Sequence, residues 1–149
     1  MRWLAVQPGP AFSVQDVHAG WVEALKAAGE HVAEFPLGPA LTFYDNAMMR
    51  TGATEFRKAM SGERATELAV DRLAGALYKV RPQVLLLTSG FFIPHELLDL
   101  ARRDGTRVVL LATEQPYETE RELALAEHCD VVVLNDPTHL ERFTALTRA

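Results

Sequence analysis

Four short apolar runs, each bounded by turn residues, constrain the fold of this chain more than any other feature. They span residues 3–6, 84–87, 108–112 and 131–134, and polar residues do not alternate within them. Continuous apolar runs of this length are typical of strands that are covered on both faces of a parallel sheet. A fifth run, residues 31–35, alternates and therefore indicates a strand nearer a sheet edge.

Helical patterns lie between and after these runs. Apolar residues recur at helical spacing over residues 14–28, 65–80, 94–103, 119–127 and 137–146, and Asp136 is the expected cap of the last helix. Strands that alternate with helices predict a parallel sheet with right-handed crossovers. We therefore expect a single α/β domain over residues 1–149, with a doubly wound, Rossmann-like, five-stranded sheet in the order 3-2-1-4-5. The flavodoxin-like order 2-1-3-4-5 is the alternative.

One segment, residues 36–64, is too long for a plain connection between the second and third strands. It carries the apolar residues Leu41, Phe43, Tyr44, Met48, Met49, Phe56 and Met60. We expect a helical insertion of one or two short helices whose apolar side chains cover another surface. It either packs over the sheet, closes over a ligand or forms a self-association surface.

Composition excludes several classes of protein. The chain has 149 residues, 48% of them hydrophobic, and a net charge of −5, so it gives no electrostatic reason to bind nucleic acid or an anionic membrane. Its one cysteine, Cys129, excludes a disulfide framework and is expected to be a buried, inert thiol. No apolar run approaches the roughly 18 residues of a membrane span, so we expect a cytoplasmic protein. No metal-ligand spacing or cofactor motif is present, and we expect neither a metal nor a cofactor.

The chemistry of such a sheet is expected at the carboxyl ends of its strands, at the switch in strand order. For the order 3-2-1-4-5 this switch lies between strands one and four, so loops 7–13 and 113–118 are the first candidates. Loop 7–13 has one glycine, Gly9, between two prolines. Because prolines have no amide hydrogen and the other glycines of a dinucleotide fingerprint are missing, a classical NAD site is not expected.

Two side chains have the position and chemistry of a base. His18 lies one turn into the first helix, inside an apolar stripe expected to contain Val14, Val17 and Trp21; it is either a buried structural histidine or a base that reaches the crevice. Glu114 follows directly after the fourth strand and is either a solvated turn residue or an acceptor of a substrate proton.

Further candidates surround these two. Asp16 stands three residues after Ser13 in an arrangement like a capping box, which by itself needs only helix capping. The residues expected to contact a substrate share positions in the loops that follow strands. They are Gly9, Ser13, Ser89, Gly90, Tyr117 and Asn135.

Residues 13–32 and 82–137 carry a family resemblance. The passage from Ser13 through Gly29 to Val32, entering the second strand, resembles the start of B-type (twin-Rossmann) glycosyltransferases. The turns Thr113-Glu114-Gln115-Pro116-Tyr117 and Asn135-Asp136-Pro137 resemble those of actinobacterial or phage glycosyltransferase-like proteins related to the spore-maturation protein CgeB. The chain is similar to the amino-terminal half of such enzymes.

This resemblance implies an acceptor-binding domain that needs a second, donor-binding domain or partner chain for transfer from a nucleotide sugar. The acceptor is then a small molecule or a glycan. Asp16 and His18 match the positions near which these enzymes place a catalytic base, and Glu114 is a third candidate. Two other readings stay open: a non-catalytic binding or assembly module, homo-oligomeric through residues 41–60, and a small nucleotide- or effector-binding domain.

Overall fold

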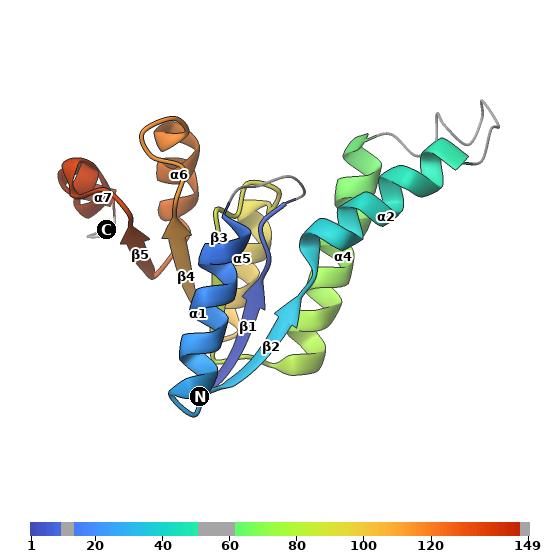
Figure 1. The fold of residues 1–149 in the computed structure, drawn as a ribbon, viewed down its shortest axis with the longest axis horizontal. Helices are drawn as coiled ribbons and strands as arrows, with labels where there is room; N and C mark the ends of the chain where they lie inside the picture. The colour runs from blue at the N-terminus through green and yellow to red at the C-terminus, as the bar shows by residue number, and fades with distance from the viewer. Residues whose placement is uncertain (10–13, 51–61, 147–149) are drawn as a thin grey trace.

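The chain folds around a parallel five-stranded sheet (Figure 1). The computed structural model describes residues 1–9, 14–50 and 62–146, with only the backbone at 47–50. The strands are β1 (Arg2–Val6), β2 (His31–Phe35), β3 (Val84–Thr88), β4 (Arg107–Ala112) and β5 (Val131–Leu134). The helices are α1 (Gln15–Ala27), α2 (Leu37–Arg50), α4 (Gly62–Val80), α5 (His95–Arg103), α6 (Thr119–Ala126) and α7 (Leu140–Leu146). The predicted Rossmann-like α/β class is confirmed.

The preferred strand order 3-2-1-4-5 is wrong, because the strands lie in the order β2-β1-β3-β4-β5, which is the flavodoxin-like alternative. All five residues of β3 are buried, whereas four of the five residues of β2 are at least partly exposed. A strand that is apolar on both faces is stable inside a sheet, and an alternating strand is stable at its edge. The switch in strand order therefore lies between β1 and β3, not between β1 and β4.

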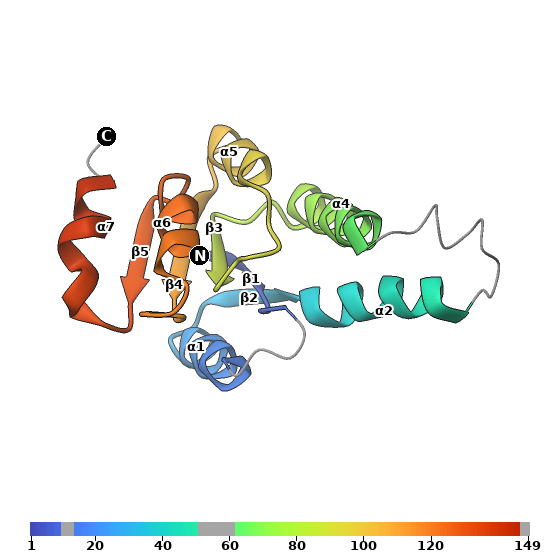
Figure 2. The same ribbon diagram turned by 90° about the horizontal axis from the view of Figure 1, so that it is seen from above.

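Successive residues of each strand enter different halves of the core. Leu4, Leu85, Leu87 and Leu110 pack in one cluster with α4 and α5. Their neighbours in the strands, including Ala5, Leu86 and Leu111, pack with Val22 of α1 on the other face. Figure 2 shows α1 on one side of the sheet and α4 and α5 on the opposite side. Helices thus cover both faces, as expected for a doubly wound sheet.

Helix α1 buries a different stripe from the predicted one. His18 and Val22 are buried, but Val17 and Trp21 are 36% and 39% exposed. Residues 14, 18 and 22 are spaced by four, so they form one row along the helix, and 17 and 21 fall on its flank. The prediction that His18 lies on the buried side is confirmed, and the placement of Val17 and Trp21 there is wrong.

The insertion after β2 begins as a helix, as predicted. In α2, Leu37 and Leu41 are buried in the core, whereas Phe43 is 61% exposed. The distal part of α2 extends away from the sheet alongside α4 (Figure 2). Two of the apolar residues predicted to belong to the insertion, Phe56 and Met60, lie in the segment 51–61, outside the described residues.

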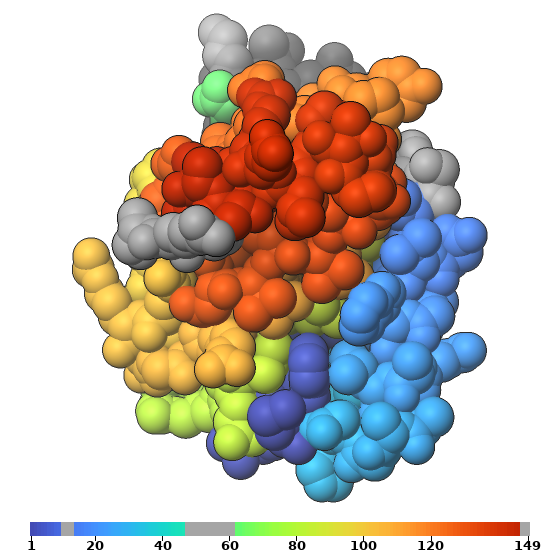
Figure 3. Space-filling view, turned by 90° about the vertical axis from the view of Figure 1, so that its left-hand side faces the viewer, coloured from blue at the N-terminus to red at the C-terminus, as the bar shows by residue number. Residues whose placement is uncertain are grey.

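The last strand, β5, lies at one edge of the sheet, and the C-terminal residues, red in Figure 3, cover this side of the molecule. The predicted cap is present, because the Asp136 side chain accepts a hydrogen bond from the Thr138 N–H at 2.8 Å. Phe143 of α7 is buried against α6, on the face that Val132 and Leu134 share. Val131 and Val133 point the other way and are 41% and 36% exposed. Within the described ranges, no helix is both long and apolar enough to cross a bilayer.

Candidate functional site

The corrected strand order places the crevice between the loops that follow β1 and β3. The chain turns sharply after β3, where Ser89 and Gly90 both have positive φ, 62° and 74°. A left-handed residue other than glycine is strained by roughly 1 kcal/mol, so the surrounding contacts must stabilise Ser89 in this conformation. Its N–H donates to the Leu111 carbonyl at 3.1 Å, which ties the turn to β4.

Ser89, Thr113 and Glu114 form a hydrogen-bonded cluster at this edge. The Ser89 hydroxyl lies 2.9 Å from the Thr113 hydroxyl and donates to Oε1 of Glu114 at 3.2 Å. The Thr113 hydroxyl is 3.5 Å from the same oxygen. Asn135 donates from Nδ2 to the Thr113 carbonyl at 3.1 Å and so links the loop after β5 to this cluster. The structure thus brings together three of the predicted residues, Ser89, Glu114 and Asn135.

A buried carboxyl group lies behind the cluster. Glu122 of α6 is fully buried, and its Oε1 accepts the Glu114 backbone N–H at 2.8 Å. Burial raises the pKa of Glu122, and the N–H of Glu114 opposes that rise. Within the part of the chain that the structure describes, Oε2 of Glu122 makes no hydrogen bond of ordinary geometry, but the side-chain amide of Gln115 lies near the carboxyl group and also opposes the rise of its pKa. Glu122 therefore anchors the loop that carries Glu114.

His18 reaches the same edge from α1. Its Nδ1 is 3.1 Å from the Thr88 hydroxyl, and Thr88 directly precedes Ser89. Its Nε2 is 3.7 Å from Oε2 of Glu34 on β2. The side chain is 2% exposed, so it is enclosed and does not face a ligand in this conformation. Burial lowers the pKa of His18, and the nearby Glu34 carboxylate raises it by a smaller amount.

The buried imidazole has a measurable consequence. We expect the His18 resonance in a residue-resolved NMR titration to show a pKa below the ordinary value of 6.5. Because the unfolded chain then binds a proton at higher pH than the folded one, the free energy of unfolding falls as the pH drops below about 6.5. The same resonance in the urea-unfolded chain is the control. A folded pKa at or above the unfolded one would contradict the enclosed, neutral histidine.

The remaining predicted residues are placed differently. Asp16 is exposed, and its Oδ1 accepts the N–H of Val17, so its contact is local to α1. Tyr117 is 90% exposed. Gly9 and Gly90 are buried in the loops after β1 and β3. Ser13 lies outside the described residues.

Sequence reasoning missed Thr88, Thr113 and Glu122. The sequence does mark the two threonines, because Thr88 is the polar residue that ends one apolar strand and Thr113 is the polar residue that follows another. The sequence marks Glu122 less clearly, because Glu122 only shares a helical face with Thr119, Leu123 and Ala126, which are all buried. A carboxylate on a buried helical face needs a hydrogen-bond donor, and here that donor is the N–H of Glu114.

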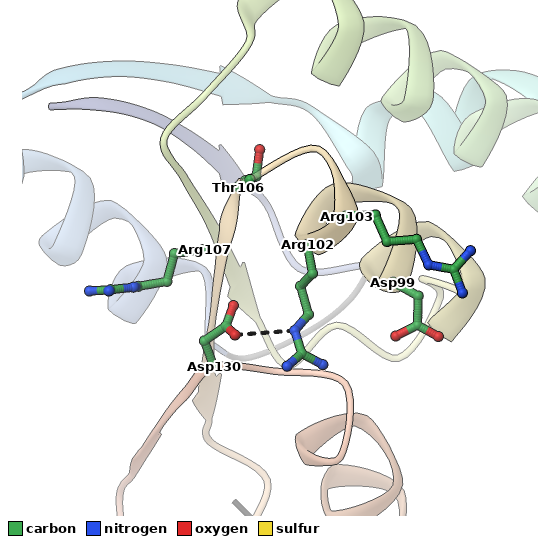
Figure 4. A pocket seen from close by; sticks show the side chains of 7 residues that line it. Asp99, Arg102, Arg103, Thr106, Arg107 and Asp130 are labelled. Atoms are coloured by element: carbon green, nitrogen blue, oxygen red, sulfur yellow. Dashed lines mark hydrogen bonds and ion pairs between the residues drawn. The ribbon is translucent and has the colours of Figure 1, made fainter.

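The opposite, amino-terminal edge of the sheet holds a cavity of about 580 Å³ (Figure 4). Arg102, Arg103 and Arg107 line it, but their guanidinium groups point in different directions. Arg102 donates to Oδ1 of Asp130 at 3.1 Å, and Oδ2 of Asp130 accepts the Val108 N–H at 2.8 Å. These contacts join α5 to the start of β4, and no set of donors from the described residues converges on one ligand there.

Comparison with known proteins produced no match: no family model, no curated protein and no solved structure matched the chain. Over residues 1–9, 14–50 and 62–146, no three histidine, cysteine, aspartate or glutamate side chains are grouped to hold a metal ion. The functional conclusion therefore depends on the hydrogen-bonded cluster at the carboxyl edge.

Proposed function

We propose that this chain is the acceptor-binding domain of a B-type glycosyltransferase, which transfers a sugar from a nucleotide sugar once a donor-binding domain or partner chain is supplied. The observation that carries the proposal is the orientation of Glu114. The backbone N–H of Glu114 donates to Oε1 of Glu122 at 2.8 Å, and Oε1 of Glu114 accepts a hydrogen bond from the Ser89 hydroxyl at 3.2 Å. Such a fixed carboxylate at a strand end suits a general base.

The two oxygens of Glu114 have different surroundings. Oε1 accepts a hydrogen bond from the Ser89 hydroxyl, whereas Oε2 accepts none from the residues described here. Oε2 is thus the atom that is left to receive a proton. In an inverting transfer it takes the proton of an acceptor hydroxyl, whose oxygen bonds to the anomeric carbon. The bond from that carbon to the nucleoside diphosphate breaks, and the electron pair leaves with the diphosphate.

His18 has a positioning role in this proposal. It holds the Thr88 hydroxyl at 3.1 Å, and Thr88 leads into the strained turn at Ser89. The imidazole thus fixes Thr88 at the end of β3, Thr88 positions the neighbouring Ser89, and the Ser89 hydroxyl orients Glu114. Asn135 supports the other side through the Thr113 carbonyl. Asp16, exposed on the first turn of α1, has no part in it.

The donor site belongs to a second domain in this proposal. Gly9 is the one glycine of the loop after β1, between prolines, so that loop is poorly suited to bind a diphosphate through backbone N–H groups. Closure of two domains over the substrates excludes water and completes the site in enzymes that work this way. We place the protein in the cytoplasm, where its single thiol stays reduced. Burial raises the pKa of Cys129 to about 12, which fits the inert thiol expected from the sequence.

Transfer assays with this chain test the proposal. We expect no turnover of uridine, guanosine or thymidine diphosphate sugars by the chain alone, and turnover when a candidate donor-binding domain is added. Replacing His18 by alanine is expected to lower the rate of the mixture by loosening the Ser89 turn. Turnover by the isolated chain would contradict the half-enzyme view, and no turnover by the mixture would overturn the assignment.

An assembly module is the second candidate, and exposed apolar side chains favour it. Phe43 of α2 is 61% exposed, and Val131 and Val133 of β5 form an exposed apolar pair at the sheet edge. Side chains at 47–60, which the sequence assigned to a self-association surface, lie outside the described residues. Light scattering separates the candidates, because an assembly module forms oligomers as its concentration rises, and a strict monomer contradicts it.

A further inference from the structure

A groove of about 400 Å³ lies between α4 and the loop that joins β3 to α5. Residues 91–94 of that loop form one wall, and Thr66, Glu67, Val70 and Asp71 of α4 form the other. In Figure 2 the loop after β3 lies beside α4. The volume falls within the range of roughly 300–1,000 Å³ that small-molecule sites occupy. Because Phe91 follows Ser89 by two residues, the groove and the cluster share one loop.

The aromatic wall is held in place by its neighbours. Gly9 of the loop after β1 packs so closely on Phe92 that a Cβ at Gly9 would lie 2.0 Å from the ring. The guanidinium carbon of Arg121 lies 4.1 Å from the centre of the Phe91 ring. Both rings are therefore anchored to other loops or helices, and an anchored aromatic surface loses little entropy when a ligand packs on it.

The opposite wall supplies carboxylate hydrogen-bond acceptors and carries a net negative charge, because it holds Glu67 and Asp71 but, among the described residues, only one nearby cation, Arg64. Glu67 forms an exposed ion pair with Arg64 at 2.8 Å, and Arg121 lies over the Phe91 ring, which still lines the groove. Asp71 is exposed on the same wall of the groove as Glu67, and its charge interacts with Arg64 at longer range than the ion pair of Glu67 does. Carboxylate acceptors facing an aromatic wall suit a ring that bears hydroxyl groups better than they suit an anion or a wholly apolar ligand.

We propose that this groove binds the ring of a carbohydrate, with its carbon face on Phe91 and Phe92 and its hydroxyl groups donating to Asp71 and Glu67. The inference rests on the proposed function and deepens it: the acceptor is a sugar or glycan, not an apolar aglycone. The ring then lies next to the turn at Ser89, from which another of its hydroxyl groups, or that of a linked sugar, reaches Glu114.

Titration by saturation-transfer and heteronuclear NMR tests the groove. The probes are methyl β-glucopyranoside, methyl β-galactopyranoside and methyl α-mannopyranoside, with p-nitrophenol as the apolar comparison. We expect at least one glycoside to bind and to shift the resonances of residues 91–94. Asp71→Asn is expected to weaken that binding about tenfold, the usual effect of losing a hydrogen bond to a charged group. Phe91→Leu weakens it as well, and Glu23→Gln on α1 leaves it unchanged.

The outcomes separate this inference from the proposed function. Binding that depends on Asp71 without any transfer by the complete enzyme supports the groove and overturns the transferase. Transfer that is insensitive to Asp71→Asn and Phe91→Leu supports the transferase and overturns the groove. Absence of binding by all three glycosides, or binding of p-nitrophenol alone, also overturns the groove. Retained backbone spectra of the variants show that a loss of binding is not a loss of folding.

Discussion

Replacing Glu114 by glutamine is expected to lower the rate of sugar transfer by about two to four orders of magnitude, the usual contribution of a positioned general base. Glutamine keeps the shape of the side chain, and its amide oxygen still accepts the Ser89 hydroxyl that lies 3.2 Å from Oε1. What it loses is the ability to take a proton. The measurement is kcat for the chain mixed with its donor-binding domain, with acceptor KM expected to change far less than kcat.

A matched variant shows whether the loss belongs to the site. Glu127→Gln removes an exposed carboxylate at the end of α6 that has no part in the hydrogen-bonded cluster, and is expected to keep the full rate. If Glu114→Gln keeps more than half of the rate while its spectra stay native, Glu114 is not the base. The fixed carboxylate would then be a structural contact between the loops after β3 and β4.

Replacing Leu87 by alanine is expected to destabilise the fold by about 2–5 kcal/mol. Leu87 is fully buried in β3, whose neighbours on either side are β1 and β4, and its side chain lies in the cluster formed with α4 and α5. Removing it leaves a cavity that neighbouring side chains fill only in part, so the lost contacts add to the lost burial. Equilibrium unfolding in urea measures the difference in the free energy of unfolding.

The control for this variant is another aliphatic residue in the same sheet. Val133 of the edge strand β5 is 36% exposed, so Val133→Ala removes less buried surface and is expected to cost below about 1 kcal/mol. Similar losses for both variants would contradict the position of β3 inside the sheet. A larger loss for Val133→Ala would mean that another surface covers β5 in solution.

Four of the strands were predictable because each is a short apolar run bounded by turn residues, and the fifth, β2, was predictable from its alternation. The run at 131–134 was predicted with the bounds that β5 has, and the run at 84–87 lacks only Thr88 of β3. The helix at 137–146 was also expected, although it begins as a short 3-10 turn over Pro137–His139 before α7. Local patterns carry this information, since apolar period and capping residues act within a few residues of chain.

The candidate site was predictable only in part. Glu114, Ser89 and Asn135 follow strands, so a parallel sheet brings their positions to one edge regardless of strand order. The enclosure of His18 against Thr88 and Glu34 depends on which strands are neighbours, because β1 must have β2 on one side and β3 on the other. Glu122 was missed because its partner is a backbone N–H eight residues earlier, which composition does not reveal.

Sequence alone determined the secondary structure, the parallel sheet and the edge at which the polar side chains gather. Only the tertiary structure decided the strand order, the enclosure of His18, the pairing of Glu122 with the Glu114 loop and the groove between Phe91 and Asp71. The physical reason is the range of the interactions. Apolar periodicity acts along neighbouring residues, whereas the order of strands and the contacts of a buried polar group depend on segments far apart in the chain, whose packing no local pattern specifies.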